Sequence, residues 1–412
     1  MESMQGTPRG NRLHIGIFGR TNSGKSSLLN ALIRQDFAVV SEYAGTTTDP
    51  VFKSMEIHGI GPVTFIDTAG FSDTTALGKA RAEKTEDALQ KTDVAVVVFA
   101  PENRADGFAA EKEWMEKLRS RKTPAVPVLN KTDAVSCVPE LLEAAARAAG
   151  EMPVAVSALQ GTGIPEILTQ IRRKIPEDSG AGFLTAGLCS PGDAVLLVMP
   201  QDIQAPKGRL ILPQVQVIRE LLDRGCIIHC CTPDVLTRTL DTLAEPPALI
   251  ITDSQVFKTV YDKKPEASRL TSFSVLLAAE KGNISRFAEG ADGIGRLRGD
   301  SKVLIAEACA HAPLTEDIGR EKIPAMLRQF LNRKYPGEGD RLQIEVVSGT
   351  DFPEDLSPYS LVIHCGACMF NRAYVLARQE AAAEAGVPMT NYGITIAWLN
   401  GILDKVTLPQ KK

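Results

Sequence analysis

Short apolar runs alternate with amphipathic stretches along most of this chain, which is the pattern of an α/β fold. In its first part, strand-sized runs end in polar or glycine-containing turns, and residues 27–33 have helical spacing. The strands predicted there are 13–18, 63–66, 94–100, 125–129 and 154–156. The segment 175–182 is rich in Gly, Pro and polar residues, so we predict a first domain over residues 1–175.

The same alternation restarts twice after that segment. A middle domain is predicted over residues 183–262, with strands at 194–199, 226–231 and 248–252 and helices at 213–224 and 233–243. A last domain is predicted over residues 268–412, with strands at 302–308, 342–348 and 360–363 and helices at 321–334 and 371–385. The alternation predicts that both of these smaller αβ domains have mainly parallel sheets.

Composition narrows the function classes. The 412 residues are 44% hydrophobic and 23% charged, as in an ordinary globular protein, and the formal net charge is -4. This balance gives no electrostatic attraction to nucleic acid or to an anionic membrane, so we expect neither as a partner. No apolar run approaches the roughly 18 residues of a membrane-spanning helix. We therefore expect a cytoplasmic protein, whose 8 cysteines are ligands, reactive thiols or core residues.

Residues 19–26 read GRTNSGKS and lie between a predicted strand and a predicted helix. This is the phosphate-binding P-loop pattern in its required context, in which backbone N–H groups turn around the phosphates. We expect Lys25 to reach the β- and γ-phosphates and Ser26 to bind Mg²⁺. Further nucleotide contacts are expected from Gly19, Asn22, Ser23, Gly24 and Ser27.

Later segments identify the base. Asp67 begins the sequence DTAG at the end of a strand, where it suits the Mg²⁺ shell, and Gly70 can offer its N–H to the γ-phosphate. The sequence NKTD follows another strand, and its Asp133 can accept two hydrogen bonds from guanine that adenine cannot donate. The predicted nucleotide is therefore GTP. The remaining candidates are Thr47, as the Mg²⁺ hydroxyl, and, around the base, Asn130, Lys131, Ser157 and Ala158.

In these residues the first domain resembles a translation-factor-class GTPase of the Era/TrmE type, which implies a P-loop GTPase domain. Phe71 follows DTAG where Ras-like proteins have a water-orienting Gln, so hydrolysis should be slow or assisted. Asn22 resembles the asparagine of potassium-activated relatives, in which K⁺ replaces an arginine finger. The alternative is that Asn22 only stabilises the turn of the loop. We expect Lys25, Asn22 and Gly70 to support catalysis and K⁺ to stimulate it.

Two short clusters of soft ligands lie in the last domain. Cys309 and His311 follow one predicted strand, and His364, Cys365 and Cys368 follow another. Residues just past the carboxyl ends of parallel strands meet in one crevice, so the two clusters can meet in space. Three thiolates with one exchangeable position fit a [4Fe–4S] cluster, whereas structural zinc would take either histidine as a fourth ligand.

The roles of the histidines and of one cysteine stay open at this point. His311 and His364 are candidate fourth ligands, but His311 could be an ordinary loop residue and His364 could orient the cluster without binding it. Cys368 is expected near the N-terminus of the following helix, where the thiolate is favoured.

The middle domain contains a second group of cysteines. Residues 226–231 read CIIHCC, which raises the question of a second metal site. Neighbouring residues of a strand point to opposite faces, and thiols pack well in buried strands, so we favour core packing for them. A small sheet has exposed edges, and self-association is a reasonable use for such edges.

A P-loop GTPase followed by Cys-x-His and, further on, His-Cys-x-x-Cys resembles the HydF family of [FeFe]-hydrogenase maturation GTPases over essentially the whole chain. The resemblance implies a homodimer with GTPase, dimerisation and cluster-binding domains. It implies that Cys309, Cys365 and Cys368 bind a [4Fe–4S] cluster whose fourth site is labile and accepts a diiron precursor. The implied role is a scaffold that receives this precursor with the help of radical S-adenosylmethionine maturases and delivers it to apo-[FeFe]-hydrogenase.

Two other functions fit parts of the sequence. One is a ribosome- or RNA-associated GTPase with a structural zinc site, which the acidic charge balance disfavours. The other is a thiol oxidoreductase gated by GTP, in which Cys309 would have no role.

Overall fold

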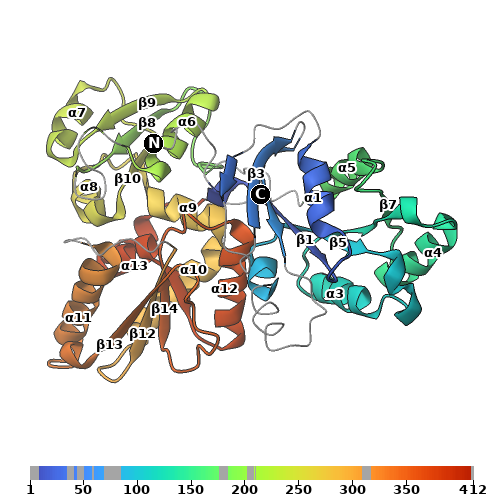
Figure 1. The fold of residues 1–412 in the computed structure, drawn as a ribbon. Coiled ribbons are helices and arrows are strands. Elements are labelled where there is room, and N and C mark those ends of the chain that lie inside the picture. Colours follow the sequence, from blue (N-terminus) through green and yellow to red (C-terminus); the bar gives the residue numbers. More distant parts are fainter. Residues whose placement is uncertain are drawn as a thin grey trace. The chain divides into compact units, whose positions relative to one another are not determined.

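The computed structural model describes residues 9–34, 41–43, 51–57, 60–68, 85–175, 184–201, 208, 210–308 and 317–409. The chain forms two compact units, Met1–Ala181 and Gly182–Lys412 (Figure 1). Both are built on sheets flanked by helices, so the predicted α/β class is confirmed. The division of the second unit into two domains stays a prediction. Among the described helices, none has the length and apolar character needed to cross a membrane.

The first unit contains one seven-stranded sheet, in the order β2-β3-β4-β1-β5-β6-β7. Its elements are β1 (Leu13–Gly19), α1 (Lys25–Ile33), β2 (Ser41–Tyr43), β3 (Val51–Ile57), β4 (Gly61–Asp67), β5 (Val94–Phe99), α3 (Ala109–Ser120), β6 (Ala125–Leu129), α4 (Val138–Ala149), β7 (Val154–Ala155) and α5 (Ile164–Lys174). β3 is antiparallel to both of its neighbours, and the other pairs are parallel. α1 and α5 cover one face and α3 and α4 the other, which buries every residue of β1 and β5.

The second unit contains two four-stranded sheets, and all of their strand pairs are parallel. The first sheet has the order β11-β10-β8-β9, with β8 (Ala194–Val198), α6 (Leu212–Asp223), β9 (Ile227–Cys231), α7 (Leu236–Thr242), β10 (Leu249–Thr252), α8 (Phe257–Lys263), β11 (Arg269–Ser272) and α9 (Phe273–Lys281). The second sheet has the order β13-β12-β14-β15, with α10 (Ile284–Gly290), β12 (Lys302–Glu307), α11 (Ile323–Lys334), β13 (Gln343–Ser348), β14 (Leu361–His364), α12 (Arg372–Glu384), β15 (Met389–Asn391) and α13 (Tyr392–Leu399). One continuous core joins residues of both sheets, such as Val198 of β8 and Val303 of β12.

The predicted elements differ from the observed ones mainly at their ends. The helix predicted over residues 233–243 is a 3-10 turn, Pro233–Val235, followed by α7. The helix predicted over residues 321–334 starts two residues later, after a π-helical turn at Ile318–Lys322. The short strands β11 and β15 were not predicted, because four or three residues give too little periodicity to recognise.

The prediction of core packing for the cysteines of residues 226–231 is wrong for Cys230, which is exposed, and only partly right for Cys231, which is half-buried. β9 lies at the edge of its sheet, and none of its residues is fully buried. Only Cys226, just before the strand, is in the core, where its Sγ lies 3.7 Å from Sγ of Cys189. The position at the sheet edge therefore overrides the apolar character of the sequence.

Candidate functional site

The P-loop connects β1 to α1 in the first unit. Lys25 is 7% exposed, and its Nζ donates to the carbonyl oxygens of Gly19 at 3.0 Å and Arg20 at 2.8 Å. Burial lowers the pKa of Lys25 to about 8, and the nearby Asp67 carboxylate opposes this shift. The ammonium group is thus held inside the loop, beside the backbone that surrounds a phosphate in this motif.

The predicted Mg²⁺ ligands Ser26 and Asp67 lie together. The exposed Ser26 donates its hydroxyl to Oδ2 of Asp67 at 2.8 Å, while Oδ1 has no hydrogen-bond partner in the described part of the chain. Burial raises the pKa of Asp67, and the Ser26 hydrogen bond and the Lys25 charge oppose this. A hydroxyl and a carboxylate are hard oxygen donors, so the pair fits a magnesium ion. Thr47, Gly70 and Phe71 lie outside the described residues.

Asn130 connects the P-loop to the loops predicted to surround the base. Its Nδ2 donates to the carbonyl oxygen of Ser23 at 3.1 Å, and its Oδ1 accepts from the backbone N–H of Ala158 at 3.1 Å. Gly24 must be glycine here, because its φ is 89° and a Cβ would lie 2.3 Å from Asn130 Nδ2. The buried Asn130 side chain therefore connects the P-loop to the loop that carries Ala158.

The other predicted base-contacting residues lie beside Asn130. Asp133 is exposed and accepts a hydrogen bond from the Ser157 hydroxyl, which leaves its second oxygen available to a guanine. Lys131 is held by an ion pair with Glu102, with Nζ 2.7 Å from Oε1. The structure thus brings together all five candidates on these two loops.

Asn22 and Ser27 are both exposed. Asn22 has a φ of 65°, a left-handed conformation that Asn tolerates better than most residues. This conformation agrees with a role in the turn and leaves the side chain in solvent, so both interpretations of Asn22 stand.

A buried ion pair on the P-loop was not predicted. Arg20 contacts Asp106, with Nη1 2.6 Å from Oδ2, and Glu111, with Nε 3.2 Å from Oε1. Glu111, on α3, is completely buried, and Asn103 also donates to its Oε1 at 2.7 Å. These contacts fix the P-loop to the helix that covers β5.

The two cysteine clusters of the second unit follow neighbouring strands. β12 and β14 pair in parallel, with Ala306 opposite His364, and the N–H of Cys365 donates to the carbonyl of Ala306 at 3.0 Å. The expectation that the two strand ends meet is thus confirmed. Ala308 N lies 3.0 Å from Cys365 Sγ, and Cys309 is the next residue in the chain. Cys309 and His311 themselves lie outside the described residues.

The surroundings of Cys365 suit a metal-bound thiolate. Its Sγ accepts hydrogen bonds from the N–H groups of Ala308 at 3.0 Å and Ala367 at 3.4 Å. The second of these requires a tight turn, in which Ala367 has a φ of 54°. Such N–H···S bonds are among the contacts that tune iron–sulfur sites. Within the described ranges no group of three or more His, Cys, Asp or Glu residues could hold a metal, since Cys309 and His311 are not among them.

Both described thiols are shifted away from ionisation. Burial raises the pKa of Cys365 to about 11, and it also raises the pKa of Cys368, although the Lys281 charge opposes it there. The expectation that a helix N-terminus favours the Cys368 thiolate is therefore not met. α12 starts only at Arg372, and the side chain of its N-cap residue Asn371 accepts from a free N–H of the first turn.

His364 is fully buried and both ring nitrogens have protein partners. Nδ1 lies 2.9 Å from the carbonyl oxygen of Cys365, and Nε2 lies 2.9 Å from Nη1 of Arg378. Burial and the Arg378 charge lower the pKa of His364 to about 3, so the ring is neutral. A neutral ring that donates from Nδ1 and accepts at Nε2 has no lone pair left for a metal, which favours the orienting role over direct ligation.

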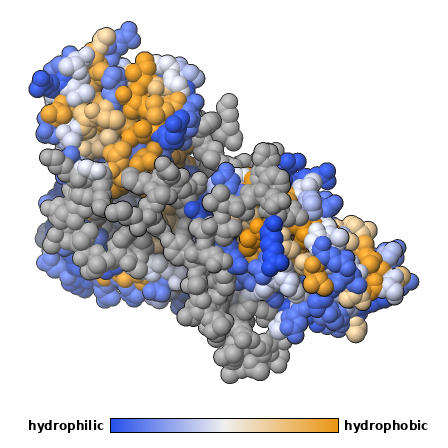
Figure 2. All heavy atoms as spheres, turned by 45° about the horizontal axis from the view of Figure 1, so that its top comes forward, coloured by the Kyte–Doolittle hydropathy of each residue, from blue (hydrophilic) through white to orange (hydrophobic). Residues whose placement is uncertain are grey.

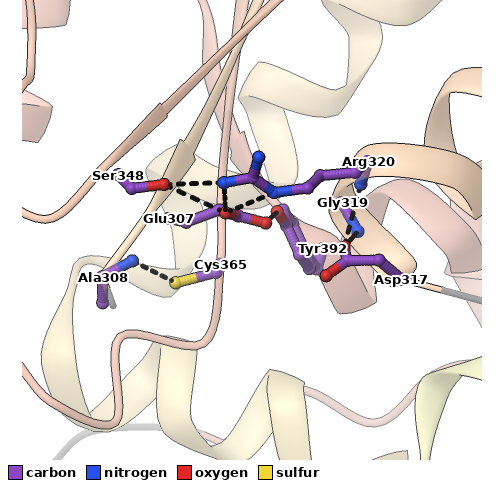
Figure 3. A network of polar contacts seen from close by, with 8 residues as sticks. All are labelled: Glu307, Ala308, Asp317, Gly319, Arg320, Ser348, Cys365 and Tyr392. Atoms are coloured by element: carbon purple, nitrogen blue, oxygen red, sulfur yellow. Dashed lines mark hydrogen bonds and ion pairs between the residues drawn. The ribbon is translucent and has the colours of Figure 1, made fainter. Parts of the chain in front are cut away.

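A polar network surrounds the end of β12, close to Cys365 (Figure 3). Oε2 of Glu307 accepts from Nη2 of Arg320 at 2.9 Å and from the Ser348 hydroxyl at 3.2 Å, and Tyr392 donates to Oε1 at 3.4 Å. Asp317 caps the turn that carries Arg320. Glu307 and Arg320 lie on opposite sides of residues 309–316, so their ion pair joins the chain on both sides of Cys309.

Three family models match the chain. Residues 14–131 match the model of the 50S ribosome-binding GTPases, residues 184–282 the Hydrogen maturase F dimerization domain, and residues 285–409 the Hydrogen maturase F tetramerization domain. The fold and the site therefore define a GTPase with a TrmE/Era-type nucleotide domain, joined to domains for self-association. The two Hydrogen maturase F models together span more than half of the 412 residues, and the chain belongs to the Hydrogen maturase F (HydF) family.

Curated relatives resemble part of the chain. The tRNA modification GTPase MnmE of Heliobacterium modesticaldum is 36% identical over 251 residues, which are 60% of this chain and 50% of that protein. The MnmE of Streptococcus pneumoniae serotype 4 is 30% identical over 237 residues, 57% of this chain and 46% of that protein. The chain thus spans about half the length of these relatives. The crystal structure of Aquifex aeolicus Era is 21% identical, covers 53% of this chain and 92% of its own, and has a TM-score of 0.34.

Proposed function

We propose that this protein is a GTPase scaffold that holds a [4Fe–4S] cluster on Cys309, Cys365 and Cys368 and delivers a diiron precursor to apo-[FeFe]-hydrogenase. Radical S-adenosylmethionine maturases would supply the precursor. The observation that carries the proposal is the 3.0 Å contact between Cys365 Sγ and the N–H of Ala308, the residue before Cys309. Membership of the hydrogen maturase family supports the choice of partners.

The described residues fit this group by their chemistry. Cys365 and Cys368 are soft donors at the end of one strand pair, and Cys365 Sγ already accepts two N–H groups. A cluster bound by three thiolates supplies one iron with an exchangeable position. The protein's part is to hold the thiolates, to keep Cys365 half-buried, and to fix the Cys365 backbone through His364.

Anaerobic reconstitution with iron and sulfide tests the cluster. We expect about four irons per chain, by analogy with a [4Fe–4S] ligand set, and an EPR signal in the reduced protein. Serine substitution of Cys309, Cys365 or Cys368 should remove the signal. Cys230→Ser is the matched control, because Cys230 is exposed and lies in the other sheet of the unit. Stoichiometric, colourless zinc in place of iron would contradict the proposal and favour an RNA-associated GTPase of the kind that MnmE represents.

GTP hydrolysis is assigned to the first unit. Lys25 would neutralise the charge of the phosphates, Ser26 and Asp67 would hold Mg²⁺ together with Thr47, Gly70 would donate to the γ-phosphate, and Asp133 would select guanine. We further propose that Asn22 binds a K⁺ ion that stimulates hydrolysis.

The left-handed φ of Asn22 provides a sharp test of the potassium site. Asn22→Gly retains the turn conformation, because glycine adopts positive φ freely, but removes the amide oxygen. We expect the wild type to be faster in KCl than in NaCl of equal ionic strength, and the variant to lose this difference while it keeps its GTP affinity. Equal wild-type rates in both salts would refute the idea, and a variant that stays potassium-dependent would assign Asn22 to the turn alone.

The homodimer is proposed to form through the outer edge of β9, which pairs with no other strand among the described residues. Figure 2 shows apolar side chains gathered over the part of the second unit that contains its first sheet. In the elements of this sheet layer, Ile227 of β9 is 54% exposed and Leu222 of α6 is 52% exposed. An unpaired strand edge beside an apolar surface is suited to pairing with a second copy. Ile227→Lys should shift the mass measured by light scattering toward the monomer. Met152→Lys, which changes an exposed residue of the first unit, should leave the mass unchanged.

A further inference from the structure

Arg378 is a buried cation close to the proposed cluster site. Its side chain lies on α12 and is 3% exposed, and its Nε has no hydrogen-bond partner in the described part of the chain. Its Cζ lies 4.6 Å from the ring centre of Phe352 and 4.7 Å from those of Phe370 and Tyr374. Nη2 donates to the carbonyl oxygen of Gly349 at 2.6 Å. The guanidinium therefore occupies a cage of three aromatic rings.

Among the described residues, no acidic side chain neutralises the charge of Arg378. No carboxylate of the described residues forms an ion pair with Arg378, and the groups that act on its charge are Tyr374 and Cys365. Lys281, the cation near Cys368, differs in this respect, because its Nζ lies 3.9 Å from Oε1 of Glu280. A buried guanidinium without a counter-ion loses several kcal/mol of hydration, and each ring returns only about 0.5–2 kcal/mol. Burial of the Arg378 charge therefore costs least free energy when Cys365 carries a negative charge as a thiolate.

Arg378 is also connected to Cys365 by a chain of hydrogen bonds through His364. Its Nη1 lies 2.9 Å from Nε2 of His364, whose Nδ1 lies 2.9 Å from the carbonyl oxygen of Cys365. Asn391 Nδ2 donates to the same oxygen at 3.3 Å. Arg378 thus sets the orientation of His364, which in turn fixes the peptide group of a proposed ligand.

We infer that Arg378 is the built-in counter-charge of the cluster thiolates, which raises the reduction potential of the cluster and positions Cys365 through His364. The inference rests on the proposed cluster site. Reduction adds a negative charge to the cluster, and a fixed positive charge nearby stabilises the reduced form more than the oxidised form. Arg378 is therefore a positioning residue whose charge has a measurable electrochemical effect.

The test is an EPR-monitored redox titration of the reconstituted full-length protein. Arg378→Gln removes the charge and retains an N–H donor for His364. We expect the ratio of reduced to oxidised cluster at a fixed solution potential to fall about tenfold, which is about 59 mV for a one-electron couple. Arg378→Lys keeps the charge and should keep most of the wild-type potential. Arg286→Gln removes a charge from an exposed ion pair with Glu380 and should have no effect.

A second pair of variants covers the case in which Arg378→Gln does not fold. Phe352 is only half-buried, so Phe352→Glu can place a carboxylate against the guanidinium, and Phe352→Gln is its uncharged control. The Glu variant should lower the potential relative to the Gln variant. Equal potentials in the folded variants and the wild type would overturn the inference and leave the cluster site intact. A wild type that binds no cluster would instead refute the proposed function itself.

Discussion

Lys25 should make nucleotide affinity depend on pH. Burial lowers its pKa to about 8 in the free protein, whereas a lysine in unfolded chain has 10.5. The phosphates of a bound nucleotide are anions and raise the pKa of an adjacent ammonium group again. Above pH 8, Lys25 is therefore mostly deprotonated in the free protein, whereas it is protonated in the complex. Nucleotide binding must then be accompanied by uptake of a proton. Affinity consequently falls as the pH rises.

The size of the effect follows from linkage. With a free-state pKa of about 8 and a bound-state pKa above the range studied, the dissociation constant increases about fourfold between pH 7 and 8.5. Folding stability depends on pH in the opposite direction to nucleotide affinity. Because the folded-state pKa lies below the unfolded one, the unfolded chain binds more protons between about 8 and 10.5, and the unfolding free energy contributed by Lys25 rises with pH in that window.

The assay is a fluorescence titration with a non-hydrolysable GTP analogue and Mg²⁺ at constant ionic strength. Lys25→Met lacks the titrating group and serves as the reference for every other pH effect, including that of the nucleotide phosphates. The ratio of wild-type to variant dissociation constants should rise about fourfold from pH 7 to 8.5. A constant ratio over this range would show that Lys25 stays protonated in the free protein and would refute the reasoning.

Three further results are expected. Gly24→Ala should weaken nucleotide binding by about 1–3 kcal/mol, measured by the same titration, because the new Cβ would displace Asn130 and strain a left-handed backbone; an unchanged affinity would contradict the close contact. Glu111→Ala should lower the unfolding free energy by about 1–3 kcal/mol in denaturant, since it removes one partner of the buried Arg20 charge; Glu113→Ala, on the same helix and exposed, should not. Lys25→Ala should abolish GTP hydrolysis and leave the iron content after reconstitution at the wild-type value, whereas a loss of iron would mean that the two units depend on each other.

The sequence could predict how the candidate residues of the nucleotide site are arranged because each motif is local. Asp67 ends β4 and Asn130 directly follows β6, and runs of apolar residues mark both strands. Lys25 and Ser26 begin the helix after the loop that follows β1, and a parallel sheet brings these strand ends together. The same geometry predicted that the ends of the strands before Cys309 and Cys365 meet, and β12 and β14 do pair there, although they belong to different parts of the sequence. The arrangement of residues that lie next to the ends of strands can be predicted once the strands are recognised.

Other features depend on pairings that no local pattern contains. The exposure of Cys230 follows from the place of β9 at the sheet edge, which is set by the order of all four strands. Arg378 lies in the middle of an Ala-rich helix, where a charged residue is ordinarily taken for a solvent-exposed one. Arg20 and Glu111 become partners only when α3 packs on the sheet. Such features need the assembled fold.

The pairing of β12 with β14 also bears on the order in which folding and metal binding would occur. The thiol of Cys365 and the residue before Cys309 become neighbours only when two sequence-distant strands hydrogen-bond. If the three cysteines bind a cluster as proposed, the sheet must therefore form before the metal can bind to all of them. Small metal-binding domains behave differently, since they remain unfolded until the ion arrives. Here one core of apolar side chains joins both sheets, which supports folding of the unit before any metal binds. Under the proposed function, loading and unloading of metal would take place on a protein that has already folded, so cargo could be exchanged repeatedly without refolding.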